Sequence, residues 1–278
     1  MEVLQQRVRS AAPPPFMQVL RAFWAWPIAG LVAIVALVAA PGPLHHTAHQ
    51  VLHGLCAQQP SHSFFFGDRP LPFDARMTGI YGGLVIAICW FVLRHRLRGW
   101  GIPPRSVLAL LVGSVGLMAI DGTNSLLVDL QLWHPYPPTN VGRLVTGLGA
   151  GVAMASLLVW LFATSIWASG QPSAAVRTGR ELGEIGLLLV PYAIAVLVAP
   201  EFLYVPMSIL LLFSAWLTLT ALMLVIVVLC TRRDGTFVDA HQFHVPVLGA
   251  SALALGLMLG LASARYWLER MMGLTVAM

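Results

Sequence analysis

Long apolar stretches alternate with short polar segments along the chain. Each stretch approaches the roughly 20 residues that an α-helix needs to cross the hydrocarbon core of a bilayer. Seven such stretches can be placed, at residues 23–40, 78–93, 107–120, 144–167, 185–199, 205–230 and 245–264. The pattern therefore predicts an all-α fold, a polytopic transmembrane helical bundle of about seven spans.

Composition agrees with this prediction. Hydrophobic residues make up 58% of the 278 residues and charged residues only 10%, whereas a soluble domain has roughly 25% charged residues. A soluble fold of this size could not cover so much apolar surface, but lipid solvates it directly. The simplest division is a segment at residues 1–22 followed by a single transmembrane domain at residues 23–278. Gly147 and Gly151, and likewise Gly256 and Gly260, have a spacing that allows helices to approach closely.

The arginines indicate how the chain is oriented. All 16 basic residues are arginine, and with the N-terminus inside, 11 of them fall in cytoplasmic segments and five in outer ones. This bias follows the positive-inside rule, so we expect an inner-membrane protein with a cytoplasmic N-terminus and an outer C-terminus. A signal peptide cleaved after residues 38–40 is the alternative for the first stretch. Because the arginines are dispersed, we expect the lipid bilayer as a partner and no nucleic acid.

Two long outer loops, residues 41–77 and 121–143, hold most of the unusual side chains. In the first, residues 44–59 have the pattern of an amphipathic helix lying on the membrane surface. His45, His49, His53 and Cys56 line one side of it, at a spacing that lets neighbouring side chains share a metal ion. These four are candidate metal ligands, and a metal ion is the only cofactor indicated. A polar face wetted by water and head groups is the alternative.

Charged residues also stand at the ends of neighbouring spans. Asp121 and Arg143 lie at facing ends of two spans, so they can pair with each other, or either can pair with Arg76 or Asp74. Charges at membrane depth are costly unless they are paired or functional. A structural ion pair and a binding site therefore both remain open. The candidate binding residues are Arg76, Asp121, Arg143, Asp74, Asn124 and Asn140.

A set of motif positions lies between residues 44 and 151. They are His53, Cys56, Gln58, Pro60, Ser63, Phe64, Gly67, Pro72, Ala75, Arg76, Gly79, Ile80, Tyr81, Gly83, Asp121, Gly122, Asn140, Arg143, Thr146 and Gly147. In type and spacing this set resembles the uncharacterised bacterial and archaeal membrane proteins grouped as domain-of-unknown-function family twenty eighty-five. The resemblance implies a shared membrane architecture for this part of the chain.

The chain departs from the family's signature at several positions. Asp74 and Met77 stand where the family has the two cysteines of a Cys-Ala-Arg-Cys motif, Ala57 replaces a histidine, and His62 replaces an arginine. In other members this set looks like a His/Cys metal site or a thiol pair. With Cys56 alone, a thiol–disulfide mechanism cannot operate here. The resemblance thus favours a shared framework over a shared metal chemistry.

Three classes of function remain. The first is an outer-facing polar site that binds or passes a small ion or the head group of a lipid-linked molecule. The second is a non-catalytic subunit of a larger complex, with other membrane subunits as partners, and the third is a metal-dependent membrane enzyme. We expect no catalytic residues, because the chain carries none of the common catalytic motifs. The chemistry is expected around Arg76, Asp121 and Arg143.

Overall fold

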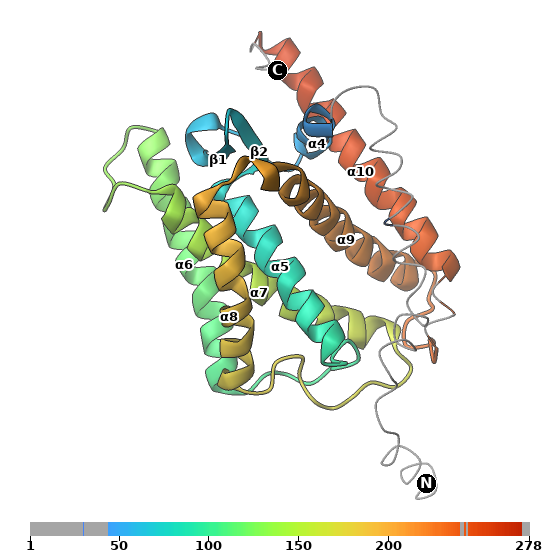
Figure 1. Ribbon diagram of the computed structural model, residues 1–278. Helices are drawn as coiled ribbons and strands as arrows, with labels where there is room; N and C mark the ends of the chain where they lie inside the picture. The colour runs from blue at the N-terminus through green and yellow to red at the C-terminus, as the bar shows by residue number, and fades with distance from the viewer. Residues whose placement is uncertain (1–29, 31–43, 240–241, 243, 274–278) are drawn as a thin grey trace, which may run out of the picture.

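Long helices form the body of the protein (Figure 1). The structure, a computed structural model, describes residue 30, residues 44–239, residue 242 and residues 244–273. The long helices in these ranges are α5 (Ala75–Leu93), α6 (Arg105–Asp129), α7 (Asn140–Ile166), α8 (Gly179–Val198), α9 (Tyr204–Cys230) and α10 (His244–Met271). These six are long and apolar enough to cross a membrane, which confirms the predicted helical bundle. The predicted first span at residues 23–40, apart from Gly30, and the segment at residues 1–22 lie outside the described residues.

The helices extend beyond the apolar stretches that predicted them. The largest difference is in α6, which continues to Asp129, so Asp121 and Asn124 lie inside a helix and the segment that joins α6 to α7 is residues 130–139. A prediction from hydropathy places the end of a span at the first polar residues. The helix continues here because these polar side chains find partners in the neighbouring elements.

One end of the bundle carries the short elements, and we call it the hairpin end. It consists of α4 (Leu44–Leu52), the 3₁₀ turn η1 (Pro60–His62), strands β1 (Ser63–Phe66) and β2 (Arg69–Asp74), and the adjoining ends of the long helices. The two strands form an antiparallel hairpin that the sequence did not predict, with Gly67 at φ +63° in its turn. The predicted helix over residues 44–59 ends earlier, at Leu52.

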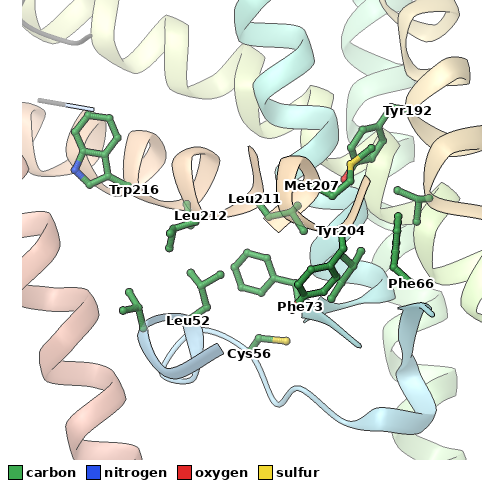
Figure 2. Close-up of a cluster of buried hydrophobic side chains, with 14 of the residues drawn as sticks. Leu52, Cys56, Phe66, Phe73, Tyr192, Tyr204, Met207, Leu211, Leu212 and Trp216 are labelled. Carbon is green, nitrogen blue, oxygen red and sulfur yellow. The ribbon is translucent and has the colours of Figure 1, made fainter. Parts of the chain in front are cut away.

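The end of α4 packs directly on α10. A Cβ on Gly54 would come within 3.0 Å of the backbone nitrogen of Ala262, a distance that real Cβ atoms avoid. Beside this contact a buried apolar cluster joins α4 and β2 to α9, and Leu52, Phe73 and Leu211 are fully enclosed in it (Figure 2). Burial of Leu52 and Phe73, which lie outside the spans, stabilises the fold by about 1.5–3 kcal/mol each. The cluster thereby fixes β2, which leads into α5.

Helices α5 and α7 cross at a contact between their backbones. A Cβ added to Gly79 would come within 3.0 Å of the carbonyl oxygen of Leu144. A Cβ added to Gly151 would come equally close to the carbonyl oxygen of Ile80. Small residues four apart allow this approach in membranes, as the spacing of Gly147 and Gly151 suggested. The crossing brings the first turns of the two helices together at the hairpin end.

Candidate functional site

An ion pair joins α5 to α6 at the hairpin end. The Nη2 atom of Arg76, in the first turn of α5, lies 2.7 Å from Oδ2 of Asp121 and also donates to the hydroxyl of Ser125 at 3.0 Å. The other carboxylate oxygen of Asp121 accepts from the Tyr136 hydroxyl at 3.1 Å. Asp121 is buried. The structure thus forms one of the pairings that the sequence left open.

Arg143 stands beside this pair without a carboxylate of its own. It lies in the first turn of α7 and is only 5% exposed. Its Nη1 donates to Oδ1 of Asn140 at 2.8 Å, and its Nε donates to the Ser125 hydroxyl at 3.4 Å. Among the described residues no Asp or Glu oxygen lies within 4.0 Å of it. The alternative pairing of Asp121 with Arg143 is therefore not formed.

Two further predicted binding residues have structural partners. Oδ1 of Asp74 accepts the backbone N–H of Met77 at 2.8 Å and so caps the N-terminus of α5, an arrangement that satisfies one of the free donors of a helix start. The amide of Asn124 donates to the Tyr136 carbonyl at 2.8 Å. Within the described protein, however, Oδ1 of Asn124 and Nε of Arg76 are buried without a hydrogen-bond partner.

His62 lies at the rim of this cluster. Its Nε2 is 3.6 Å from Oδ1 of Asp129, at the C-terminal end of α6. The amide of Asn140 donates to backbone carbonyls on either side of His62, so η1 is held over the first turn of α7. Burial and the positive charge of Arg143 lower the pKa of His62 below its usual value.

These contacts define the Arg76–Arg143 site, made of Arg76, Asp121, Ser125, Asn140 and Arg143. It holds two guanidinium groups and one carboxylate in a largely buried setting. Guanidinium groups bind oxyanions through paired N–H donors. The arrangement therefore suits a negatively charged ligand.

The predicted metal ligands do not converge. His49 Nε2 lies 3.0 Å from the Pro70 carbonyl, and the two ring nitrogens of His53 contact Gln58 and Glu269. His45 belongs to α4, but its side chain lies outside the described part. No group of three His, Cys, Asp or Glu side chains suited to a metal ion occurs among the residues that the structure describes. The metal site stays a prediction that this arrangement does not favour.

Cys56 is enclosed as well. Its sulfur accepts backbone N–H groups from Gln58 at 3.4 Å and Asp74 at 3.3 Å. Burial, together with the negative charge of Asp74, raises the pKa of the Cys56 thiol to about 12. A thiol with such a high pKa is neutral at physiological pH and a poor nucleophile.

A second polar cluster, which the sequence did not predict, joins the end of α4 to α10. Arg265 donates from Nη1 to the carbonyl oxygens of His53, at 2.8 Å, and Cys56. Its Nε donates to Glu269 at 2.8 Å, and the other oxygen of Glu269 lies 2.8 Å from Nε2 of His53. We call this group the α4–α10 clamp. The only sequence signal for it was the four-residue spacing of Arg265 and Glu269.

At the opposite end of the bundle, several arginines contact glutamate or tryptophan side chains. Arg96 pairs with Glu181, Arg94 lies 2.7 Å from Glu184, and the guanidinium of Arg98 stands 4.0 Å from the ring centre of Trp167. These contacts tie the segment after α5 to the start of α8 and to the end of α7. They are structural contacts at the arginine-rich end.

Part of the chain is similar to a known protein family. Residues 56–157 match the family model described as "Predicted membrane protein (DUF2085)". No curated protein and no solved structure matches the chain. The matched segment runs from Cys56 through α5 and α6 into α7, and it contains every residue of the Arg76–Arg143 site. The resemblance seen in the sequence is thus confirmed over residues 56–157, and it agrees with the long apolar helices in identifying the chain as a membrane protein.

Proposed function

We propose that this membrane protein binds an anion at the Arg76–Arg143 site, with Arg143 as the principal contact. The observation that carries the proposal is a buried guanidinium with no carboxylate within 4.0 Å among the described residues. An unpaired buried charge costs several kcal/mol. A ligand of opposite charge would offset that cost, whereas a purely structural arginine would gain more from a carboxylate.

The side chains around Arg143 favour an oxyanion. Planar guanidinium groups match the oxygens of carboxylates, sulfates and phosphates, and Nε of Arg76 is a second donor without a partner in the described protein. Two sources have this chemistry, a small free oxyanion and the phosphate of a lipid head group. The arginine distribution supports an outward-facing hairpin end, where either source is available.

Titrations with sulfate and with phosphatidylglycerol distinguish a small free oxyanion from a lipid head group as the ligand. Wild-type protein in mild detergent should bind at least one of them saturably in titration calorimetry. Arg143→Gln should weaken that binding more than about tenfold, a loss of about 1.4 kcal/mol, because it removes the charge. Arg69→Gln, an exposed arginine at the same end, should change it less than about twofold.

Two results would contradict the proposal: no saturable binding of either ligand, or equal binding by wild type and Arg143→Gln. If the glutamine variant does not fold, Arg143→Lys provides a second measurement. Lysine keeps the charge but lacks the forked donors of arginine. The Arg143→Lys protein should therefore insert into the membrane normally and bind the anion with intermediate affinity.

A subunit role in a larger complex is the second candidate. Exposed aromatic side chains at the hairpin end favour it, since Trp133 is 81% and Phe202 78% exposed. Aromatic residues are enriched both at protein interfaces and at membrane–water interfaces. If the chain is a subunit, wild type should purify with a fixed set of partner proteins, and a Trp133→Ser, Phe202→Ser variant should lose that set.

A further inference from the structure

We propose that anion binding at Arg143 is coupled to protonation of His62, so that the anion and one proton are taken up together. This inference rests on the anion site proposed above. It concerns a residue that does not hold the anion but responds to its charge.

The first support is the physical connection between His62 and Arg143. Asn140 accepts from Nη1 of Arg143 at 2.8 Å through its Oδ1. Through its Nδ2 the same side chain donates to the carbonyls of Ser61 at 3.3 Å and Ser63 at 3.4 Å. One amide therefore holds both the guanidinium and the backbone on each side of His62. These bonds hold the backbone of His62 beside the first turn of α7, where the charge of Arg143 acts on the imidazole.

The second support is the set of charges that face His62. The carboxylates of Asp129, on α6, and Asp74, at the start of α5, favour its protonated form, while Arg143 and Arg76 oppose it. Burial opposes protonation most strongly, and the pKa of His62 is lowered as a result. His62 is therefore neutral at pH 7, with a carboxylate oxygen already 3.6 Å from Nε2.

An anion at Arg143 shifts this balance toward the protonated form of His62. Its negative charge cancels the repulsion between Arg143 and His62, so a proton from solvent can bind the imidazole and convert its contact with Asp129 into an ion pair. For a monoanion, uptake of one proton leaves the net charge of the buried region unchanged, which avoids the cost of a new unpaired charge. Coupling of this kind is reciprocal, so protonation of His62 strengthens anion binding by the same factor.

Proton uptake can be measured directly. Sulfate does not titrate near neutrality, so calorimetry in two buffers with different ionisation enthalpies reports protons taken up by the protein. Wild type should take up a substantial fraction of one proton per sulfate at about pH 6.5, near the ordinary titration range of histidine. Its affinity should be about fivefold higher at about pH 6 than at about pH 8.

His62→Gln should bind sulfate with an affinity that is nearly independent of pH and with almost no proton uptake. His134→Gln is the matched control, since this histidine belongs to the exposed segment between α6 and α7, and it should behave as wild type. His62→Arg carries a permanent charge. It should bind sulfate at high pH at least as well as wild type does at low pH, again without proton uptake.

The outcomes separate the two proposals. If Arg143→Gln abolishes sulfate binding while His62→Gln keeps the wild-type proton uptake, the coupling is wrong and the anion site stands. Wild-type binding without any proton uptake also overturns the coupling. If wild type binds only phosphatidylglycerol, the same proton-uptake criteria apply to titration with that lipid. If wild type binds neither sulfate nor phosphatidylglycerol, both proposals fail. If His62→Gln does not fold, the His62→Arg variant tests the coupling by itself. Proton uptake retained in His62→Arg would contradict the coupling.

Discussion

Gly147 of α7 lies against the backbone of Arg76 in α5: a Cβ at this glycine would come within 3.0 Å of the Arg76 carbonyl oxygen. Arg143 stands one turn before Gly147 on the same helix, so the helix crossing sets the separation of the two arginines. The glycines thus have a role beyond packing, since they determine the geometry of the Arg76–Arg143 site.

The crossing predicts a large effect of a single methyl group. Gly147→Ala should lower the free energy of unfolding by about 2 kcal/mol or more, because overpacking forces the two backbones apart. Thermal unfolding in detergent measures the change. Gly256→Ala is the matched control, since in the described structure nothing besides the neighbouring backbone of its own helix lies within 4 Å of a Cβ at that position. Equal melting temperatures for the two variants would contradict the close crossing.

The ion pair between Arg76 and Asp121 should contribute to stability mainly because its partners are buried together. Asp121→Asn leaves Arg76 near Arg143 without a countercharge and should cost about 2 kcal/mol. This is less than for a fully buried pair, because Arg76 remains partly exposed. The double variant Arg76→Gln, Asp121→Asn should cost less than the sum of the single variants. Asp68→Asn in the exposed hairpin turn serves as control. Additive losses in a denaturant titration would rule out direct coupling.

The six described spans and the charged residues of the candidate site could be predicted because both depend on local features. Ser125, whose hydroxyl accepts from both arginines, was missed because a serine within an apolar helix leaves no signal of its own. A bilayer imposes its thickness on every apolar stretch, and charged residues beside such stretches are rare enough to stand out. The choice of partner could not be predicted. Arg76 and Arg143 are equally plausible partners for Asp121 in the sequence, and the rotation of three helices decides between them.

Other features depend on long-range contacts that leave little local signal. The α4–α10 clamp joins His53 to Glu269 across most of the chain. The hairpin is short, and Pro70 and Pro72 stand within its second strand, so this segment resembles a loop. The continuation of α6 past Asp121 depends on a guanidinium supplied by α5. In each case tertiary partners override what hydropathy and propensity indicate.

The α4–α10 clamp should control the order of residues 53–57. Arg265 donates to carbonyls at the end of α4 that lack helical partners, which is a form of helix capping by a side chain. Arg265→Gln should therefore speed amide hydrogen exchange in residues 53–57, and leave α5 unchanged. Arg270→Gln, one turn further along α10 and exposed, should exchange as wild type does. Unchanged exchange in the Arg265 variant would show that apolar packing alone holds this turn.

Cys56 lies within residues 53–57, so the reactivity of its thiol reports how tightly this segment is held. Burial and the negative charge of Asp74 raise its pKa to about 12, so below that pH the thiol stays protonated and unreactive. In a variant with Cys89 and Cys230 replaced by alanine, maleimide should label Cys56 slowly in the folded protein and quickly after denaturation. Because the reactive form is the thiolate, labelling of the folded protein should still be rising with pH above about 9, beyond the ordinary thiol range.

Ala57→Cys, combined with Cys56→Ala, provides the matched control for that measurement. Residue 57 is exposed and directly follows the buried position, so its thiol should react at the rate of a free cysteine. Adding Arg265→Gln to the variant that retains Cys56 as its single cysteine should increase labelling of the folded protein, because residues 53–57 open more often. Rapid labelling of Cys56 in the intact protein near neutral pH would contradict both its enclosure and its raised pKa.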